Sequence, residues 1–394
     1  MAIPVVSWAT GAARWLWNKI RGRPTVHADR GAVAAGRDQH IGGSVVTGPG
    51  AIVVDRGGAG LTIVAQSGAT VNVYVDDLPK ASPPVRDPFE EGRRLQNAEQ
   101  HEAAIREFEK AFAAAQDDHQ RCALHVLIGK SFLNLGRQPE ARSHYRQALG
   151  AADLAGDEPG AAAALTGLGV VSVSAGEADG AEEYHQKAFA IYDRLGDRLG
   201  QADNLAALGT ICALRGTLVD AEERFRSSLA IYEGMGSKVG QALTLTSLGL
   251  VYAARRQPDK AEDHLKRALA MAEEAGNRTA QAIALRALGM VSYDRSELSK
   301  AEERLRRALA LHQDTGDKLG EANDLVCLAL LSVRRKEPRK ARELLNQAKA
   351  LYEAIGAGGE GPEIVRRALE HLGAVAPRQP EAKPKRSRRP RKRP

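Results

Sequence analysis

Residues 200–239 read GQADNLAALGTICALRGTLVDAEERFRSSLAIYEGMGSKV, and this pattern returns every 40 residues with no slip of register. One column of the repeat joins a large apolar residue to a small one, and a second column is an alanine twelve residues later. The first column is Ile128-Gly129, Leu168-Gly169, Leu208-Gly209, Leu248-Gly249, Leu288-Gly289 and Leu328-Ala329. The second is Ala141, Ala181, Ala221, Ala261, Ala301 and Ala341. Two independent columns with one period predict a repeat protein.

Each unit is predicted to be a pair of helices. Leu205, Leu208 and Ile211 fall at helical spacing in the first half, and Phe225 and Tyr232 continue an apolar stripe in the second. Glycine separates successive units, where it suits the left-handed conformation that ends a helix. Aromatic residues make up only 4% of the chain, which favours closely packed helices over a sheet-rich fold.

The pattern resembles the tetratricopeptide repeat, whose order of conserved positions is partly matched by Leu205, Leu208-Gly209, Ala221 and Phe225. The long period is similar to that of kinesin light chains and many bacterial regulators. The resemblance implies a mainly α fold, a right-handed α-solenoid of about seven helix pairs preceded by a small Gly-rich β segment. It also implies a non-enzymatic scaffold or adaptor for a protein or peptide partner, in bacterial signalling or defence.

Composition divides the chain into five parts. We expect an amphipathic helix over 1–24, a Gly-rich β segment over 25–76, a linker over 77–87, the α-solenoid with a capping helix over 88–373 and a disordered basic tail over 374–394. The first helix suits docking on protein, or alternatively the surface of a membrane.

Short valine and isoleucine runs at Ala51–Val54, Leu61–Val64 and Val71–Val75 predict strands of a small β-solenoid or meander. So few strands bury little apolar surface alone. We therefore expect them to pack on the helices or on a second copy of the chain, which makes self-association through this segment a predicted interaction.

The basic tail carries nine Lys or Arg residues from Arg378 to Pro394 against the single Glu381, while the whole chain has a net charge of +7. Such a run contacts phosphates without reading sequence. The predicted nucleic-acid or anionic-lipid contacts are Lys385, Arg386, Arg388, Arg389, Arg391, Lys392 and Arg393. A nucleic-acid- or membrane-tethered adaptor is therefore the alternative function.

No residue pattern predicts catalysis, a cofactor or a metal. Gly129-Lys130-Ser131 resembles the end of a phosphate loop, but it lies inside a predicted repeat helix and lacks the earlier glycine. His144, His185 and His264 fall on equivalent second helices, which places them too far apart to share a metal. Three scattered cysteines and the lack of a long apolar run predict a cytoplasmic protein, at most peripheral at the membrane.

The resemblance also implies a concave groove lined by the first helix of each pair. Carried onto this sequence, the groove residues are Asp203, Thr210, Leu243, Thr246, Leu250, Ile283, Arg286, Met290, Tyr293, Asn323, Val326 and Leu330. Arg286 is the predicted charged contact, and Asp203 and Asn323 are predicted hydrogen-bond partners. Packing between helices is the alternative role for each of these residues.

Overall fold

The computed structural model describes residues 51–56, 59–64, 78, 81–97, 100–135, 137–355 and 360–374. Within them, fifteen helices follow two short strands. The helices are α2 (Pro83–Asn97), α3 (His101–Ala114), α4 (Asp118–Asn134), α5 (Gln138–Ala155), α6 (Glu158–Ser174), α7 (Ala178–Leu195), α8 (Arg198–Arg215), α9 (Leu218–Gly234), α10 (Lys238–Ala254), α11 (Pro258–Glu274), α12 (Arg278–Asp294), α13 (Leu298–Thr315), α14 (Lys318–Arg334), α15 (Pro338–Ala354) and α16 (Glu360–Ala374).

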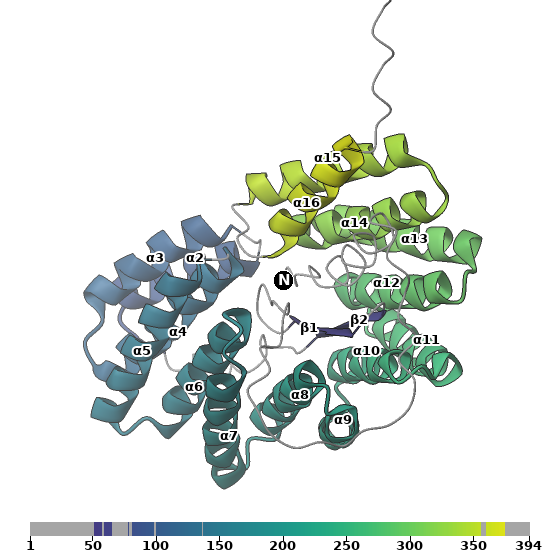
Figure 1. Cartoon of the computed structure of the whole chain (residues 1–394). Coiled ribbons are helices and arrows are strands. Elements are labelled where there is room, and N and C mark those ends of the chain that lie inside the picture. Colours follow the sequence, from purple (N-terminus) through teal and green to yellow (C-terminus); the bar gives the residue numbers. More distant parts are fainter. Residues whose placement is uncertain are drawn as a thin grey trace, which may run out of the picture.

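The helices pack as seven consecutive pairs, from α2 with α3 to α14 with α15, and α16 covers the last pair. The pairs follow one another around an arc, so the structure is a helical solenoid (Figure 1). The α-solenoid predicted from the repeat is thereby confirmed. In each pair the helix that comes first in the sequence will be called the inner helix, and the second the outer helix.

Short side-chain caps and glycines set where the helices begin and end. Asp197 accepts hydrogen bonds from the backbone nitrogens of Leu199 and Gly200, both at 3.0 Å, at the start of α8. The preceding helix ends at Gly196, whose φ of 67° lies in the left-handed region. Glycines with positive φ also follow the later outer helices, at Gly236, Gly276 and Gly316, and the next residue caps the following inner helix in each case.

The glycine column allows the two helices of a pair to approach closely. A Cβ atom on Gly249 would lie 2.6 Å from Leu265 Cγ and 3.2 Å from the carbonyl oxygen of Ala261. A Cβ on Gly289 would meet Leu305 Cγ at 2.9 Å. These positions exclude a side chain because the outer helix of the same pair fills the space.

Ion pairs repeat between units with the same period. Each joins an arginine near the end of an inner helix to a glutamate on the outer helix of the preceding unit. The four inter-unit ion pairs are Arg215 with Glu182, Arg255 with Glu222, Arg295 with Glu262 and Arg335 with Glu302. The glutamate column of the sequence therefore links neighbouring units.

The first helix starts earlier than the sequence predicts. Pro83 and Pro84 suggest extended linker backbone, but α2 begins at Pro83. Proline is well suited to the first turn of a helix, where its missing N–H has no intrahelical partner. The first helix pair therefore includes five residues assigned to the linker from sequence.

Strands β1 (Ala51–Arg56) and β2 (Ala59–Val64) pair antiparallel, with Ile52 opposite Ile63 and Val54 opposite Leu61. The strand β1 contacts α8, and β2 contacts α8 and α10. The remainder of the predicted β segment, including Val71–Val75, lies outside the described residues, as do the predicted helix over 1–24 and the basic residues of the tail. No helix in the described part is both long and apolar enough to cross a membrane.

Candidate partner-binding surface on the inner helices

The inner helices form the inner layer of the arc, and the outer helices surround them (Figure 1). The paired strands β1 and β2 lie inside the arc, against α8 and α10. The candidate site is therefore the inner face, from α2 at one end to α14 at the other.

All residues predicted to line a groove are buried. Their exposed fractions range from 0% for Thr210, Met290 and Asn323 to 5% for Tyr293. Leu243 packs with Ile283 in one apolar cluster, and Met290 and Leu330 share another. In this structure the side chains thus serve interhelical packing, and their contact with a partner stays a prediction.

Arg286 already has an internal counter-charge. Its Nη1 lies 3.1 Å from Oδ1 of Asp324 on the next inner helix, and both side chains are buried. The other oxygen of Asp324 lies 2.6 Å from Nδ1 of His312, on the intervening helix α13. The charge of Arg286 is therefore offset within the protein, and its role as a charged contact for a partner stays a prediction.

Asp203 and Asn323 are engaged in equivalent ways in two units. The hydroxyl of Tyr232 donates to Asp203 Oδ1, and the hydroxyl of Tyr352 donates to Asn323 Oδ1 at 2.6 Å. Burial and the Asp203 carboxylate together raise the pKa of Tyr232 well above its usual value. Each hydrogen bond joins the inner and outer helices of one unit. The tyrosine of the outer helix therefore fixes the orientation of Asp203 or Asn323 on the inner helix.

Lys130 is an inner-face cation that the sequence analysis set aside. It lies on α4, two periods before Thr210, and is half-buried. Burial lowers the pKa of Lys130 to about 8, and the nearby positive charge of Arg93 on α2 adds to the effect. The negative charge of Asp203 acts in the opposite direction, but among the described residues Lys130 has no hydrogen bond or ion pair. The 40-residue period alone was enough to identify its position.

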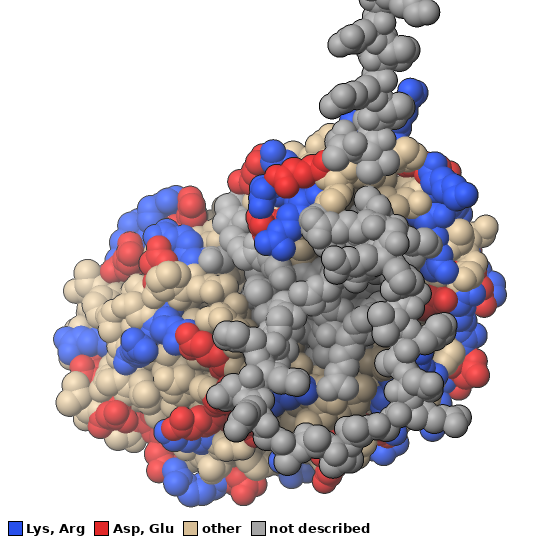
Figure 2. Space-filling model, viewed as in Figure 1, with Lys and Arg blue, Asp and Glu red and all other residues tan. Residues whose placement is uncertain are grey.

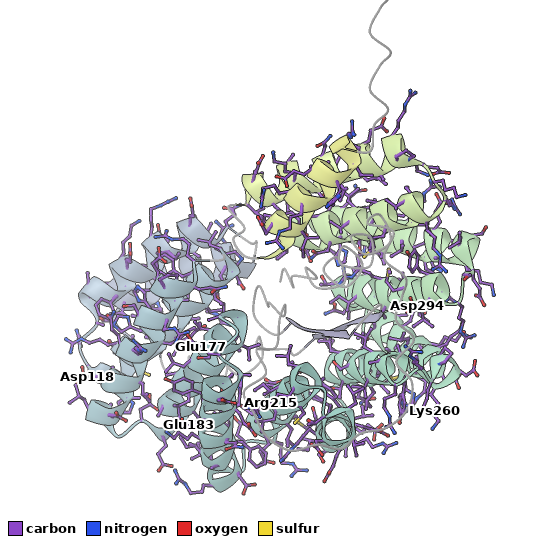
Figure 3. All side chains as sticks on the ribbon, viewed as in Figure 1. Asp118, Glu177, Glu183, Arg215, Lys260 and Asp294 are labelled. Atoms are coloured by element: carbon purple, nitrogen blue, oxygen red, sulfur yellow. The ribbon has the colours of Figure 1, made fainter. Side chains whose placement is uncertain are left out.

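Asp294 is a second charged residue that sequence reasoning missed. It ends α12 and is labelled in Figure 3. Its carboxyl reaches solvent, but the surrounding protein raises its pKa to about 7 by desolvation, an effect that Arg334 partly opposes. Arg334 is held elsewhere, because it donates to the carbonyl oxygen of Tyr293 at 2.5 Å and to Ser296 Oγ at 2.8 Å. Asp294 immediately follows the predicted groove residue Tyr293.

Charged side chains of both signs lie on the face of the solenoid that Figure 2 shows. Figure 2 shows basic and acidic side chains interspersed over the coloured surface in that view. Some exposed ion pairs lie along one helix, such as Lys187 Nζ with Glu183 Oε1 at 2.6 Å. Exposed pairs of this kind contribute little binding specificity.

Known proteins resemble this chain in the sequence of its repeats and in its fold. The tetratricopeptide repeat family matches residues 160–234 and 240–314. The fold is similar to that of a Rap protein complexed with Competence and Sporulation Factor, with 13% identity, a TM-score of 0.54, and coverage of 78% of this chain and 97% of that one. It is also similar to a tetratricopeptide repeat protein from Parabacteroides merdae, with 14% identity, a TM-score of 0.50, and coverage of 74% and 100% respectively. No curated protein matches the sequence. Residues 160–234 and 240–314 therefore contain tetratricopeptide repeats.

Proposed function

We propose that this protein is a non-enzymatic scaffold that binds a protein or peptide partner on the inner face of its repeat stack. The observation that carries the proposal is the contrast between Arg286, which forms a buried ion pair, and Lys130, whose charge is disfavoured by burial and only partly offset by Asp203. A charge held in a desolvated place without a counter-charge costs free energy, and an acidic group from a partner offsets that cost. The Rap protein of similar fold was solved as a complex, which supports a binding role for such a stack.

The proposed contacts combine apolar area with a few charges. The twelve groove residues predicted from sequence lie on the inner helices α8 to α14, and Lys130 on α4 and Asp294 on α12 supply charges of opposite sign. A partner that uses Thr210 or Leu250 shares the inner face with β1 and β2, which contact the same helices. Binding then depends on the position of this strand pair.

A pull-down from native lysate tests the proposal with four full-length baits. They are the wild type, Lys130→Glu, Asp294→Lys, and a control, Lys187→Glu, on the outer helix α7. We expect a specific protein to be retained by the wild type and the control and to be lost with Lys130→Glu or Asp294→Lys. A partner that binds all four baits equally would contradict inner-face recognition.

The alternative function is an adaptor tethered to nucleic acid or anionic membrane by its basic tail. Nine basic residues between Arg378 and Pro394 favour it. Binding should then require residues 376–394 and weaken steeply as salt rises, because phosphate contacts release counterions. Gel-shift and liposome co-sedimentation assays with and without the tail separate this function from groove binding.

Self-association through the β segment is tested by the molar mass of a chain that lacks residues 1–76.

A further inference from the structure

Two histidines face each other across the second helix pair. Nδ1 of His125, on the inner helix α4, lies 3.1 Å from Nδ1 of His144, on the outer helix α5. Their ring centroids are 5.2 Å apart. The pair joins two different helices, so its geometry depends on the packing of the unit and not on the local helical spacing.

Aromatic neighbours hold both imidazoles in place. The Phe112 ring lies 4.5 Å from the His125 ring, and the Phe132 ring stacks on His144 at 5.3 Å. The four rings thus form a continuous row drawn from α3, α4 and α5. Side chains restrained in this way lose little conformational freedom when they bind a ligand.

Both imidazoles favour the neutral form. Burial lowers the pKa of His125 to about 4, with a further contribution from His144, and burial also lowers the pKa of His144. At neutral pH one Nδ1–H donates to the other Nδ1 in the metal-free protein. Neutral imidazole is the form that ligates metals, so protons compete weakly at this pair.

We propose that His125 and His144 chelate a divalent transition-metal ion between their two Nδ1 atoms. Metal–imidazole bonds of about 2.0–2.1 Å and the observed separation of 3.1 Å imply an angle at the metal of about 100°. That angle lies between the values of octahedral and tetrahedral coordination. Imidazole nitrogen suits Zn²⁺, Ni²⁺ and Cu²⁺, whereas Mg²⁺ and Ca²⁺ prefer oxygen.

The chelate leaves coordination positions open. In the described part of the chain no third His, Cys, Asp or Glu joins the pair to complete a metal-binding group. His144 is only half-buried, so water reaches the metal position from its side. Water, or a ligand atom from another molecule, completes the coordination, and affinity is accordingly modest. Binding requires the Nδ1–H of the donor imidazole to move to its Nε2, so both rings bind as neutral ligands and no net proton is released at neutral pH.

The repeat supplies a matched control for this site. His264 lies three periods after His144, but the position three periods after His125 is Leu245. His264 instead contacts the carbonyl oxygen of Lys260 through Nδ1, at 2.9 Å. His185, on the outer helix α7, is buried and contacts Asn204 at 2.9 Å. Each of these histidines lacks the second imidazole found beside His144.

Calorimetric titration of the full chain, without an affinity tag, with NiCl₂ or ZnCl₂ tests the proposal. We expect one site per chain in wild type and in His264→Ala, and at least tenfold weaker binding in His125→Ala and in His144→Ala. Heats measured at pH 7 in two buffers of different ionisation enthalpy should agree, because both imidazoles bind as neutral ligands, and MgCl₂ should give no binding heat.

Unchanged affinity in a folded His144→Ala protein would overturn the proposal, as would equal loss in His264→Ala. His144 is the less buried member of the pair, so this variant remains informative if His125→Ala does not fold. The same metals should raise the thermal unfolding midpoint of wild type and His264→Ala but not of His144→Ala. Absence of that shift in wild type at saturating metal would also count against the site.

Discussion

Arg286 Nη1 and Asp324 Oδ1 lie 3.1 Å apart in the interior and form an ion pair that links α12 to α14. Asp324 is also bonded to His312, so one carboxylate connects three consecutive helices. Such a pair stabilises little when intact, because desolvation offsets most of the attraction. Its rupture is costly, because it leaves one charge buried without a partner.

Arg286→Ala should therefore lower the free energy of unfolding by about 3 kcal/mol. The urea dependence of the circular dichroism signal measures this change. A double variant, Arg286→Met with Asp324→Leu, removes both charges and should recover most of the loss. A loss below about 1 kcal/mol for Arg286→Ala would show that Asp324 is not stranded by the substitution.

Substitution in the glycine column should destabilise the stack. Gly249→Ala places a Cβ at 2.6 Å from Leu265 Cγ and should cost about 1–3 kcal/mol through overpacking. Gly150→Ala, on the outer helix α5, has no atom within 4 Å of the added Cβ and should stabilise by about 0.5–1 kcal/mol. Thermal unfolding of both variants separates a steric role for the column from a general effect of glycine. Equal shifts in the same direction would contradict the steric account.

Lys130→Met should stabilise the protein at pH 7 by about 1–2 kcal/mol, because it removes a desolvated charge. The folded-state pKa of about 8 lies below the ordinary value of 10.5, so the unfolded chain binds more protons between these limits. The free energy of unfolding of the wild type should rise between about pH 8 and 10.5, because Lys130 becomes neutral in the folded protein. The stability advantage of Lys130→Met should shrink over the same pH range. Chemical unfolding of both proteins across that range measures the difference, and a constant difference would refute it.

Asp294→Asn should show the opposite dependence. The carboxyl pKa of about 7 lies above its ordinary value of 3.8, so the folded protein binds more protons between these limits. Wild-type stability therefore falls as pH rises from about 4 to 7, and the unfolding midpoint of Asp294→Asn relative to wild type should rise over that interval. Asp314→Asn, on the outer helix α13, is the exposed control and should leave the wild-type profile unchanged. Parallel pH profiles for wild type and Asp294→Asn would contradict a desolvated carboxyl.

The helix pairs were predictable because their determinants repeat. Leu208, Gly209 and Ala221 recur in each unit, and the contacts that need them lie within one unit or between equivalent neighbours. The start of α2 is harder to predict, because Pro83 suits an extended linker as well as the first turn of a helix.

The site was less accessible to sequence reasoning because its key contacts do not follow the period. Asp324 lies 38 residues after Arg286, and His144 lies 19 after His125, so comparing positions 40 residues apart does not bring either pair together. Lys130 is different, because the 40-residue period does identify its position on the inner helix. Its flanking residues, Gly129 and Ser131, suggest a phosphate loop instead. The desolvation of Lys130 and Asp294 depends on how neighbouring helices pack around them. The residue type at a single repeat position does not predict that packing.

The inter-unit ion pairs give every junction from the third to the seventh unit the same chemical partners. If residues 240–279 were removed, Arg295 would follow the unit that contains Glu222 and meet it as Arg255 does now. A duplicated unit would likewise bring its own arginine and its own glutamate. The length of this solenoid can therefore change by whole units during evolution without leaving an unmatched charge at the new boundary.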